Sequence, residues 1–556
     1  MKTKYIYKRL SILISLFLIC PVIQSQDNSQ IIDLIKTEID RSYKNLYIEN
    51  LQRPFYINYT VFDRHAYTFS AENGGLSIST YKHTRNGFPY MLVGSYEMSN
   101  ATLGEKTYRI GAPHALPHPI CSDNGQGTTT VIWKVMDEIY KYIGGDMYES
   151  KMVALKNQGR YDEKLGFPDF EKREPIQVFY PVPEEKINKE FWENYVKKTS
   201  EAIYTYKDLL HSKVSVIIEQ IVAHHYDTEG TKYINPIYSY IIRVDLLARA
   251  ENGDIVSDEL YTEVSSLDRL PDLNTYINST HQAVKEFLKL LSAPKIKGEY
   301  NGPVLVQDMA LCEFLYGCFF YPDNGLIAYR TFESHYSPSE GMIGRKVMDN
   351  SLSMFSLTGS KEYNGQPLEG YVGIDAQGVI PAEKMVLVEN GILKNVLSGR
   401  NPTEKTRYSN GHMRFSFPYD VAGADIRITP GNVLVTSKET LTNEQLKQKL
   451  IEAAKDEGLD YAYIIKRMRG NNLIIMYKVY VDDGREELVR GGAMPNPDAK
   501  SFRRILGVSD KEFRYTMSPM RCLTTLIIPE SMLFESLEIV ELKNNPFLSP
   551  ILAPMP

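Results

Sequence analysis

The chain has 556 residues, which is too long for one compact hydrophobic core and predicts two or three domains. With 43% hydrophobic and 24% charged residues, the composition is that of a folded globular protein and excludes dominant disorder. The formal net charge is -6 and Lys and Arg are spread along the chain, which argues against nucleic-acid binding.

The N-terminus has the pattern of a secretory signal peptide. Several basic residues precede an apolar run over residues 10–23, and a polar stretch that includes Ser25 follows. We expect residues 1–25 to be cleaved and the mature chain to be exported, either to the periplasm or out of the cell. The neighbours of Cys20 are poor surroundings for lipidation, which disfavours a lipoprotein. No later stretch reaches the roughly 20 apolar residues of a membrane span.

The first half of the chain mixes helical and strand patterns and predicts an α+β domain over residues 26–295. Asn252-Gly253 is a strong turn signal between two strands, and Gly144-Gly145 is expected to end a helix. Helices are expected at 28–50, 128–143, 187–210 and 273–291, and strands at 56–62, 76–84, 90–97, 214–225, 238–250 and 255–264.

The second half, residues 296–556, predicts a strand-rich domain. Turn signals recur at Asn364-Gly365, Asn390-Gly391, Pro430-Gly431 and Asp483-Gly484, and one long helix is expected at 443–457. Helices and strands do not alternate regularly in either half, so the expected fold class is α+β with two domains.

The segment from Gly302 to Gly325 reads GPVLVQDMALCEFLYGCFFYPDNG and predicts a strand followed by a buried helix that Asp308 caps. Apolar side chains recur there at near-helical spacing. Two of the four cysteines beyond Cys20 lie in this helix. Four cysteines in a chain of this length do not form a disulfide scaffold, so we expect buried thiols at Cys121, Cys312, Cys318 and Cys522.

Three motifs between residues 370 and 414 match a known family. They are Ile-Asp-x-x-Gly-Val from Ile374, Val-Glu-Asn-Gly-Ile-Leu-Lys from Val388, and Ser-Asn-Gly-His-x-Arg from Ser409. This segment resembles the TldD/PmbA family of zinc metallopeptidases. The resemblance covers residues 300–542 well and the first half only weakly, where Asp227-Thr228-Glu229-Gly230 is similar to a short family turn. It implies a two-domain TldD/PmbA-like architecture.

Active members of this family carry His-Glu-x-x-x-His in the helix after the Gly-Pro-Val strand, and a later Cys completes the zinc site. In the ungapped register, Tyr316 and Tyr321 stand at the two His positions, Gly317 at the Glu position and Cys522 at the Cys position. A phenol is a poor zinc ligand at neutral pH, and glycine cannot transfer a proton. The resemblance therefore implies no catalytic residue and no zinc at these positions, as in the family branch that lacks the motif.

Three functions stay open at this stage. The first is a peptide-binding or partner subunit, in a homo- or heterodimer with a TldD/PmbA-like peptidase, that holds an extended peptide for its partner to cleave. The second is an active metallopeptidase with relocated zinc ligands, for which His335, His412 and Cys522 are the candidates. The third is a secreted protein that binds peptides or glycans, a use to which the 39 tyrosines are suited.

Overall fold

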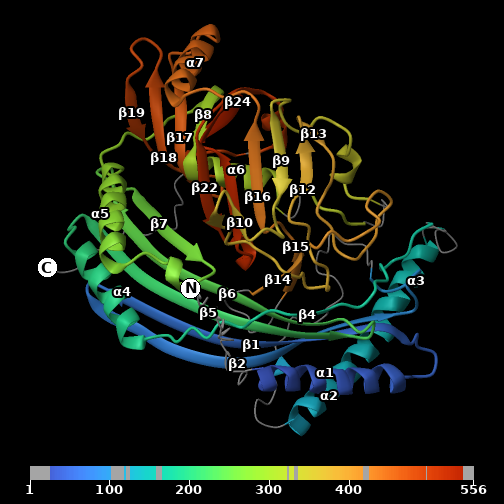
Figure 1. Cartoon of the computed structure of the whole chain (residues 1–556). Helices are drawn as coiled ribbons and strands as arrows, with labels where there is room; N and C mark the ends of the chain where they lie inside the picture. The colour runs from blue at the N-terminus through green and yellow to red at the C-terminus, as the bar shows by residue number, and fades with distance from the viewer. Residues whose placement is uncertain are drawn as a thin grey trace, which may run out of the picture.

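The structure, a computed structural model, describes residues 25–101, 118–119, 125–157, 159, 166–321, 325–330, 336–417, 425–495 and 497–542. Residues 1–24, Cys121 and His335 lie outside these ranges, so the signal-peptide prediction and two candidate side chains are not described. Within the described residues, no helix has the length and apolar character needed to cross a membrane. The fold is α+β, as predicted (Figure 1).

The N-terminal half is built on one large, curved sheet that cradles the C-terminal half (Figure 1). Its strand order is β3-β2-β1-β5-β6-β4, with β7 paired to another part of β6. Four of the strands are unusually long. The strands are β1 (Pro54–Glu72), β2 (Gly75–Val93), β3 (His118–Pro119), β4 (Gln177–Phe179), β5 (Leu209–Asp227), β6 (Lys232–Arg249) and β7 (Ile255–Val264).

The β1–β2 hairpin corrects the predicted strands 56–62, 76–84 and 90–97. Asn73 and Gly74 have φ angles of 52° and 78°, and they form the turn between two continuous strands. Gly87 and Pro89 look like turn residues in the sequence, but both lie within β2. A Cβ at Gly87 would meet the Tyr59 hydroxyl at 1.8 Å, so glycine there makes room for a neighbouring ring.

Helices cover the outer face of this sheet at two ends (Figure 1). The predicted stop at Gly144-Gly145 is wrong, because both residues lie in a π-helical turn (Ile143–Met147) that continues into the next helix. The predicted helix 187–210 is shorter, since Asn188 caps it and β5 starts at Leu209. The helices are α1 (Ser25–Asn45), α2 (Gly125–Tyr142), α3 (Tyr148–Asn157), α4 (Lys189–Tyr204) and α5 (Leu273–Lys289).

Two larger sheets form the C-terminal half, and the predicted boundary near residue 295 lies between α5 and β8. One sheet has the order β13-β12-β9-β16-β23-β22 and the other β17-β8-β24-β20-β18-β19, with β21 on β24. The first contains β9 (Leu352–Ser356), β12 (Met385–Glu389), β13 (Ile392–Leu393), β16 (Asn432–Ser437), β22 (Glu512–Met517) and β23 (Thr524–Pro529). The second contains β8 (Glu299–Gln307), β17 (Tyr461–Arg469), β18 (Asn472–Tyr480), β19 (Glu486–Val489), β20 (Gly492–Ala493), β21 (Ile505–Val508) and β24 (Ser531–Glu541).

Smaller elements complete this half. The short hairpins are β10 (Glu362–Tyr363) with β11 (Gln366–Pro367), and β14 (Met413–Ser416) with β15 (Asp425–Ile428). Asn364 and Asn390 have φ angles of 52° and 49°, which confirms the turns predicted there. The predicted helix 443–457 is α7 (Asn443–Asp456), and Thr442 caps it through a capping box with Gln445.

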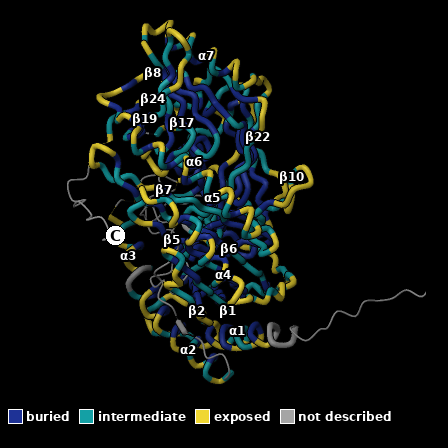
Figure 2. Tube along the Cα trace, turned by 90° about the vertical axis from the view of Figure 1, so that its left-hand side faces the viewer, coloured by how far each residue is buried: buried dark blue, intermediate teal, exposed yellow. Residues whose placement is uncertain are grey.

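The main hydrophobic core crosses from one half to the other. Phe62 of the N-terminal sheet packs edge-on against Phe415 and Phe417, with ring centroids 4.8 and 5.0 Å apart. The largest buried apolar cluster contains residues from both halves, and the buried trace is continuous between them (Figure 2). The two halves therefore share one hydrophobic core and pack directly against each other.

Candidate functional site

The segment singled out in the sequence forms β8 and the helix α6 (Asp308–Phe319). Asp308 does not cap this helix, contrary to the prediction. It is the first helical residue and has a φ angle of 51°, while Gln307 occupies the cap position. The side-chain amide of Gln307 donates to the Ser531 hydroxyl at 2.9 Å, so no side chain caps the helix start.

α6 is buried on most of its circumference, as its apolar spacing predicts. Phe314 packs against Phe502 and Phe534, with ring centroids 5.0 and 5.2 Å away. Cys312 and Cys318 are buried free thiols, which confirms the prediction for both, and Cys522 is a third. Burial raises the pKa of all three thiols, so each is held in its neutral form.

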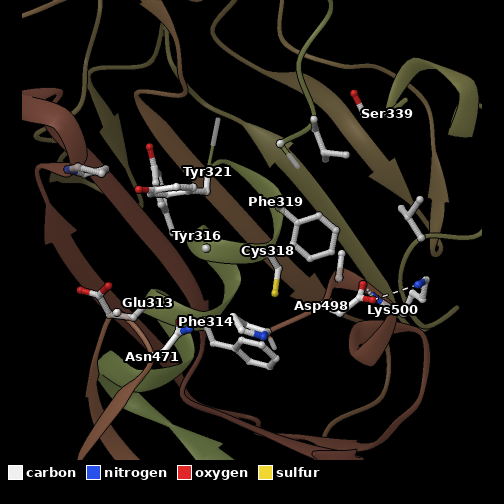
Figure 3. Close-up of a pocket in the computed structure, with 18 of the residues that line it drawn as sticks. Glu313, Phe314, Tyr316, Cys318, Phe319, Tyr321, Ser339, Asn471, Asp498 and Lys500 are labelled. Atoms are coloured by element: carbon white, nitrogen blue, oxygen red, sulfur yellow. Dashed lines mark hydrogen bonds and ion pairs between the residues drawn. The ribbon is translucent and has the colours of Figure 1, made fainter. Parts of the chain in front are cut away.

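The three positions of the altered motif lie at one end of α6 and line the same cavity (Figure 3). Tyr316 is buried, and its hydroxyl lies 3.0 Å from the Thr429 hydroxyl. Burial raises the pKa of the Tyr316 phenol above its usual range. Tyr321 is 53% exposed. A Cβ built on Gly317 would meet nothing within 4 Å, so the helix presents open space there.

Cys522 lies next to this motif, as the family register implies. The Cys522 thiol is close enough to act electrostatically on the Tyr316 phenol, and Arg414 and Arg427 act on both groups. The Cys522 sulfur donates to the Phe415 carbonyl at 3.4 Å. A neutral phenol, a neutral thiol and a glycine do not make a donor set for zinc, which prefers thiolate, imidazole and carboxylate ligands.

His412, which with Cys522 is one of the two candidate relocated ligands that the structure describes, is buried. Its Nδ1 lies 2.8 Å from the Asn410 side-chain oxygen and its Nε2 lies 2.8 Å from the Ser356 hydroxyl. Burial lowers the pKa of His412 to about 3, so the ring is neutral. Both ring nitrogens are already hydrogen-bonded, so coordination of a metal would break one of these contacts. His335 lies outside the described residues.

The cavity beside α6 has a volume of about 1060 Å³. Its wall is largely apolar and aromatic, with Phe314, Phe319, Leu326, Met342 and Met468 among its side chains. Polar groups lie at its rim, where the Lys500 ammonium and the Asp498 carboxylate are 3.1 Å apart (Figure 3). An apolar wall with a few polar groups is typical of a site for an organic ligand.

Glu313 is the carboxylate that α6 places in this cavity. It lies one turn before Tyr316 and Gly317 on the same helix. Burial raises the pKa of Glu313 to about 7, and the charge of Arg469 opposes that shift only in part. A carboxyl group with this pKa exchanges protons near neutral pH and can donate or accept a hydrogen bond to a ligand.

The sequence did not reveal how the Cys522 loop is held. Arg521 has a φ angle of 63° and pairs with Glu219 of β5, which also pairs with Arg64 of β1. The residues Arg521 and Glu219 are 302 positions apart in the chain, so no local pattern could have shown this contact. The loop next to the motif is therefore anchored to the N-terminal sheet.

Fold and site together define a two-domain α+β protein whose C-terminal domain has the framework of a metallopeptidase. A family model described as the PmbA/TldA metallopeptidase C-terminal domain matches residues 298–476. A comparison with curated proteins finds no match. Residues 298–476 of this chain therefore carry a C-terminal domain of the TldD/PmbA type.

Solved structures of low sequence identity share the fold over nearly the whole chain. A candidate modulator of a DNA gyrase from Thermotoga maritima has a TM-score of 0.56 at 15% identity, covering 91% of this chain and 99% of that chain. TldE from Thermococcus kodakarensis has a TM-score of 0.55 at 14% identity, covering 92% and 100%. A candidate modulator of DNA gyrase from Bacteroides thetaiotaomicron has a TM-score of 0.54 at 11% identity, covering 92% and 98%.

Proposed function

We propose that this chain is an exported, catalytically silent TldD/PmbA protein that binds extended peptides beside α6. It acts as the partner subunit, in a homo- or heterodimer, of a peptidase that supplies the catalytic zinc. The observation that carries the proposal is Gly317. The position that would hold the catalytic base opens onto a large cavity, while the neighbouring positions hold a neutral phenol and a neutral thiol.

The cavity offers two kinds of contact to a peptide. Its apolar wall suits large side chains, and Met517 at the end of β22 lines it. β22 is the edge strand of its sheet, and an edge strand can pair with the backbone of an extended peptide. Backbone pairing supplies affinity for many sequences, and the wall selects among side chains. Glu313 adds one group that can hydrogen-bond to a peptide amide in either protonation state.

The test is a hydrolysis assay on the purified mature chain alone. Unfolded protein substrate is incubated with the chain, with and without added Zn²⁺, and fragments are counted by mass spectrometry. We expect no hydrolysis above buffer in either condition. Zinc binding without hydrolysis agrees with the proposal, because a chain that holds a metal ion and still cleaves nothing is catalytically silent.

A variant in which the family's His-Glu-x-x-x-His motif is rebuilt is the matched comparison for the unaltered chain in this assay. Gly317→Glu meets open space, and histidine is smaller than tyrosine, so Tyr316→His and Gly317→Glu fit α6 and Tyr321→His fits the exposed position just after it. We expect this triple variant to gain zinc binding that Cys522→Ser weakens. Chelator-sensitive hydrolysis by the unaltered chain, lost in Cys522→Ser or His412→Ala, would contradict the proposal and establish the metallopeptidase with relocated ligands.

A further inference from the structure

A set of metal-type side chains lies far from α6, on the outer face of the N-terminal sheet. In the β1–β2 pair, Asp63 is opposite Arg85 and His65 is opposite His83. Phe62, on the other face of β1, contacts the C-terminal half, so Asp63 and His65 point away from it. This part of the sheet lies between α4 at one end and the α1–α2 pair at the other (Figure 1).

The three ligand-type side chains converge on one point. Asp63 Oδ1 lies 2.6 Å from His83 Nε2 and 3.7 Å from His65 Nε2. The two imidazole rings are stacked, with centroids 4.2 Å apart and planes at 11°. Within the described parts of the chain, no other set of three His, Cys, Asp or Glu residues brings its ligand atoms within 4.8 Å of one another. Ligands on one zinc ion lie about 3.3 Å apart, given bonds of about 2.0–2.1 Å, so small side-chain shifts suffice.

Neighbouring side chains orient two of the three ligands. Tyr81 lies with its hydroxyl 2.9 Å from His65 Nδ1, which directs Nε2 of the same ring toward Asp63. Arg85 Nε donates to Asp63 Oδ2 at 2.7 Å, which leaves Oδ1 facing the imidazoles. Partners of this kind fix ligand orientation in metal sites. The positive charge of Arg85 also opposes a bound cation, so we expect a weaker site than the same ligands would form without it.

The protonation states suit a metal ion. Burial and the neighbouring His83 lower the pKa of His65, which favours the neutral ring that coordinates metals. Although burial opposes it, hydrogen bonds from His83 and Arg85 hold the pKa of Asp63 below its usual value, so the carboxylate is ionised. The side chains of His65 and His83 are 38% and 34% exposed, so an ion can reach them from solvent.

We propose that Asp63, His65 and His83 form a binding site for one divalent transition-metal ion of the zinc and copper class. Two imidazoles and one carboxylate favour these ions over Mg²⁺ and Ca²⁺, which take oxygen ligands. Three protein ligands leave at least one coordination position for water or for a donor from a bound molecule. The site ties β1 to β2 and is independent of the function proposed for α6.

The test uses the full mature chain, stripped of metal with a chelator. Zn²⁺ is titrated in competition with a chromophoric chelator, and Cu²⁺ binding is followed by electron paramagnetic resonance. We expect one ion per chain and a copper spectrum with nitrogen hyperfine lines from imidazole. His65→Asn with His83→Asn should abolish this binding, and Tyr81→Phe should weaken it by about tenfold.

Three controls keep the outcome decisive. His211→Asn changes another histidine of the same sheet, and Cys522→Ser changes the candidate ligand beside α6; neither should alter the affinity. Circular dichroism and thermal unfolding of the metal-free variants show whether each is folded. The proposal is overturned if the unaltered chain binds no ion, if the double histidine variant binds as tightly, or if Cys522→Ser abolishes binding.

Discussion

Tyr316, at the position where the family motif has its first histidine, serves packing in this chain. Its ring lies against Phe320, with centroids 5.7 Å apart, and its hydroxyl meets Thr429 in the buried core. Histidine at this position would present an imidazole to Cys522, whereas tyrosine fills the space and pairs its one polar atom. The Tyr316 hydroxyl is therefore hydrogen-bonded within the core.

The raised pKa of Glu313 predicts that the stability of the folded chain depends on pH. The pKa of its carboxyl is raised to about 7 in the folded state, from an ordinary 4.5, so the folded chain keeps a proton that the unfolded chain releases. Its contribution to stability is complete below pH 4.5 and declines as the pH rises to about 7, by roughly 3 kcal/mol. Glu313→Gln removes this decline. The variant should equal the unaltered chain at pH 4.5 and be more stable by up to that amount at pH 8.

The measurement is urea unfolding at several pH values. Asp375, whose pKa burial raises to about 7, adds its own decline over the same range, so the difference between the two chains isolates Glu313. Glu439→Gln, at an exposed position, is the matched control and should show no such trend. A stability difference that is constant with pH would show that Glu313 does not titrate in this way.

At the scale of elements, the sequence predicted those helices and hairpins whose ends are set by turn or capping residues close by in the chain. The β6–β7 hairpin follows from Asn252-Gly253, and the helix predicted at 443–457 is α7, which the structure shows to be capped locally by Thr442. The β1–β2 hairpin was missed although Asn73-Gly74 is a turn signal of the same kind. The reason is that Gly87 and Pro89 interrupt the strand pattern, and only the Tyr59 ring opposite explains the glycine.

The residues of the candidate sites also fall into two groups: those that the local sequence could place together and those that only the fold brings together. Tyr316, Gly317 and Tyr321 could be placed together because they are close in the chain, the first two on α6 and Tyr321 two residues after its end, and the family register added Cys522. The Arg521–Glu219 contact and the convergence of Asp63, His65 and His83 depend on pairing between distant segments. Recognising the turn at Asn73 would have paired β1 with β2, but the register set by the turn alone puts His65 opposite Lys82. A one-residue register shift between Ser70 and Ala71 brings His65 opposite His83 instead, and no sequence signal showed that shift.

At the scale of the whole molecule, buried ion pairs join the two halves, and Arg400–Glu229 is one of them. Arg400 Nη2 donates to Glu229 Oε2 and to the Glu171 carbonyl, each at 2.6 Å, and the guanidinium lies 4.4 Å from the centre of the Phe170 ring. The side chains of Arg400 and Glu229 are 1% and 6% exposed. Glu229 belongs to the Asp-Thr-Glu-Gly turn noted in the sequence, so that turn is one of the points at which the N-terminal sheet contacts the C-terminal half.

Breaking this pair should loosen the two halves. Arg400→Met leaves the Glu229 carboxylate buried without its partner, which costs about 3–5 kcal/mol, and adding Glu229→Gln should recover part of that loss. Chemical unfolding measures both changes, and we expect the single variant to unfold in two steps. The exposed pair Arg504–Glu535 is the control, because Arg504→Met should change stability by less than about 1 kcal/mol. Equal effects at the two sites would contradict the role assigned to Arg400.

The central claim is that the cavity beside α6 binds an extended peptide and leaves it intact. Fluorescence anisotropy with a labelled unfolded peptide, followed by mass spectrometry of the same sample, tests it directly. Gly317→Phe fills the cavity from a position with open space, and Gly145→Phe places the same ring at another open glycine away from it. We predict saturable binding of uncleaved peptide that Gly317→Phe weakens at least about tenfold and Gly145→Phe does not change. Absence of binding, equal binding by the two variants, or a cleaved peptide would contradict the account.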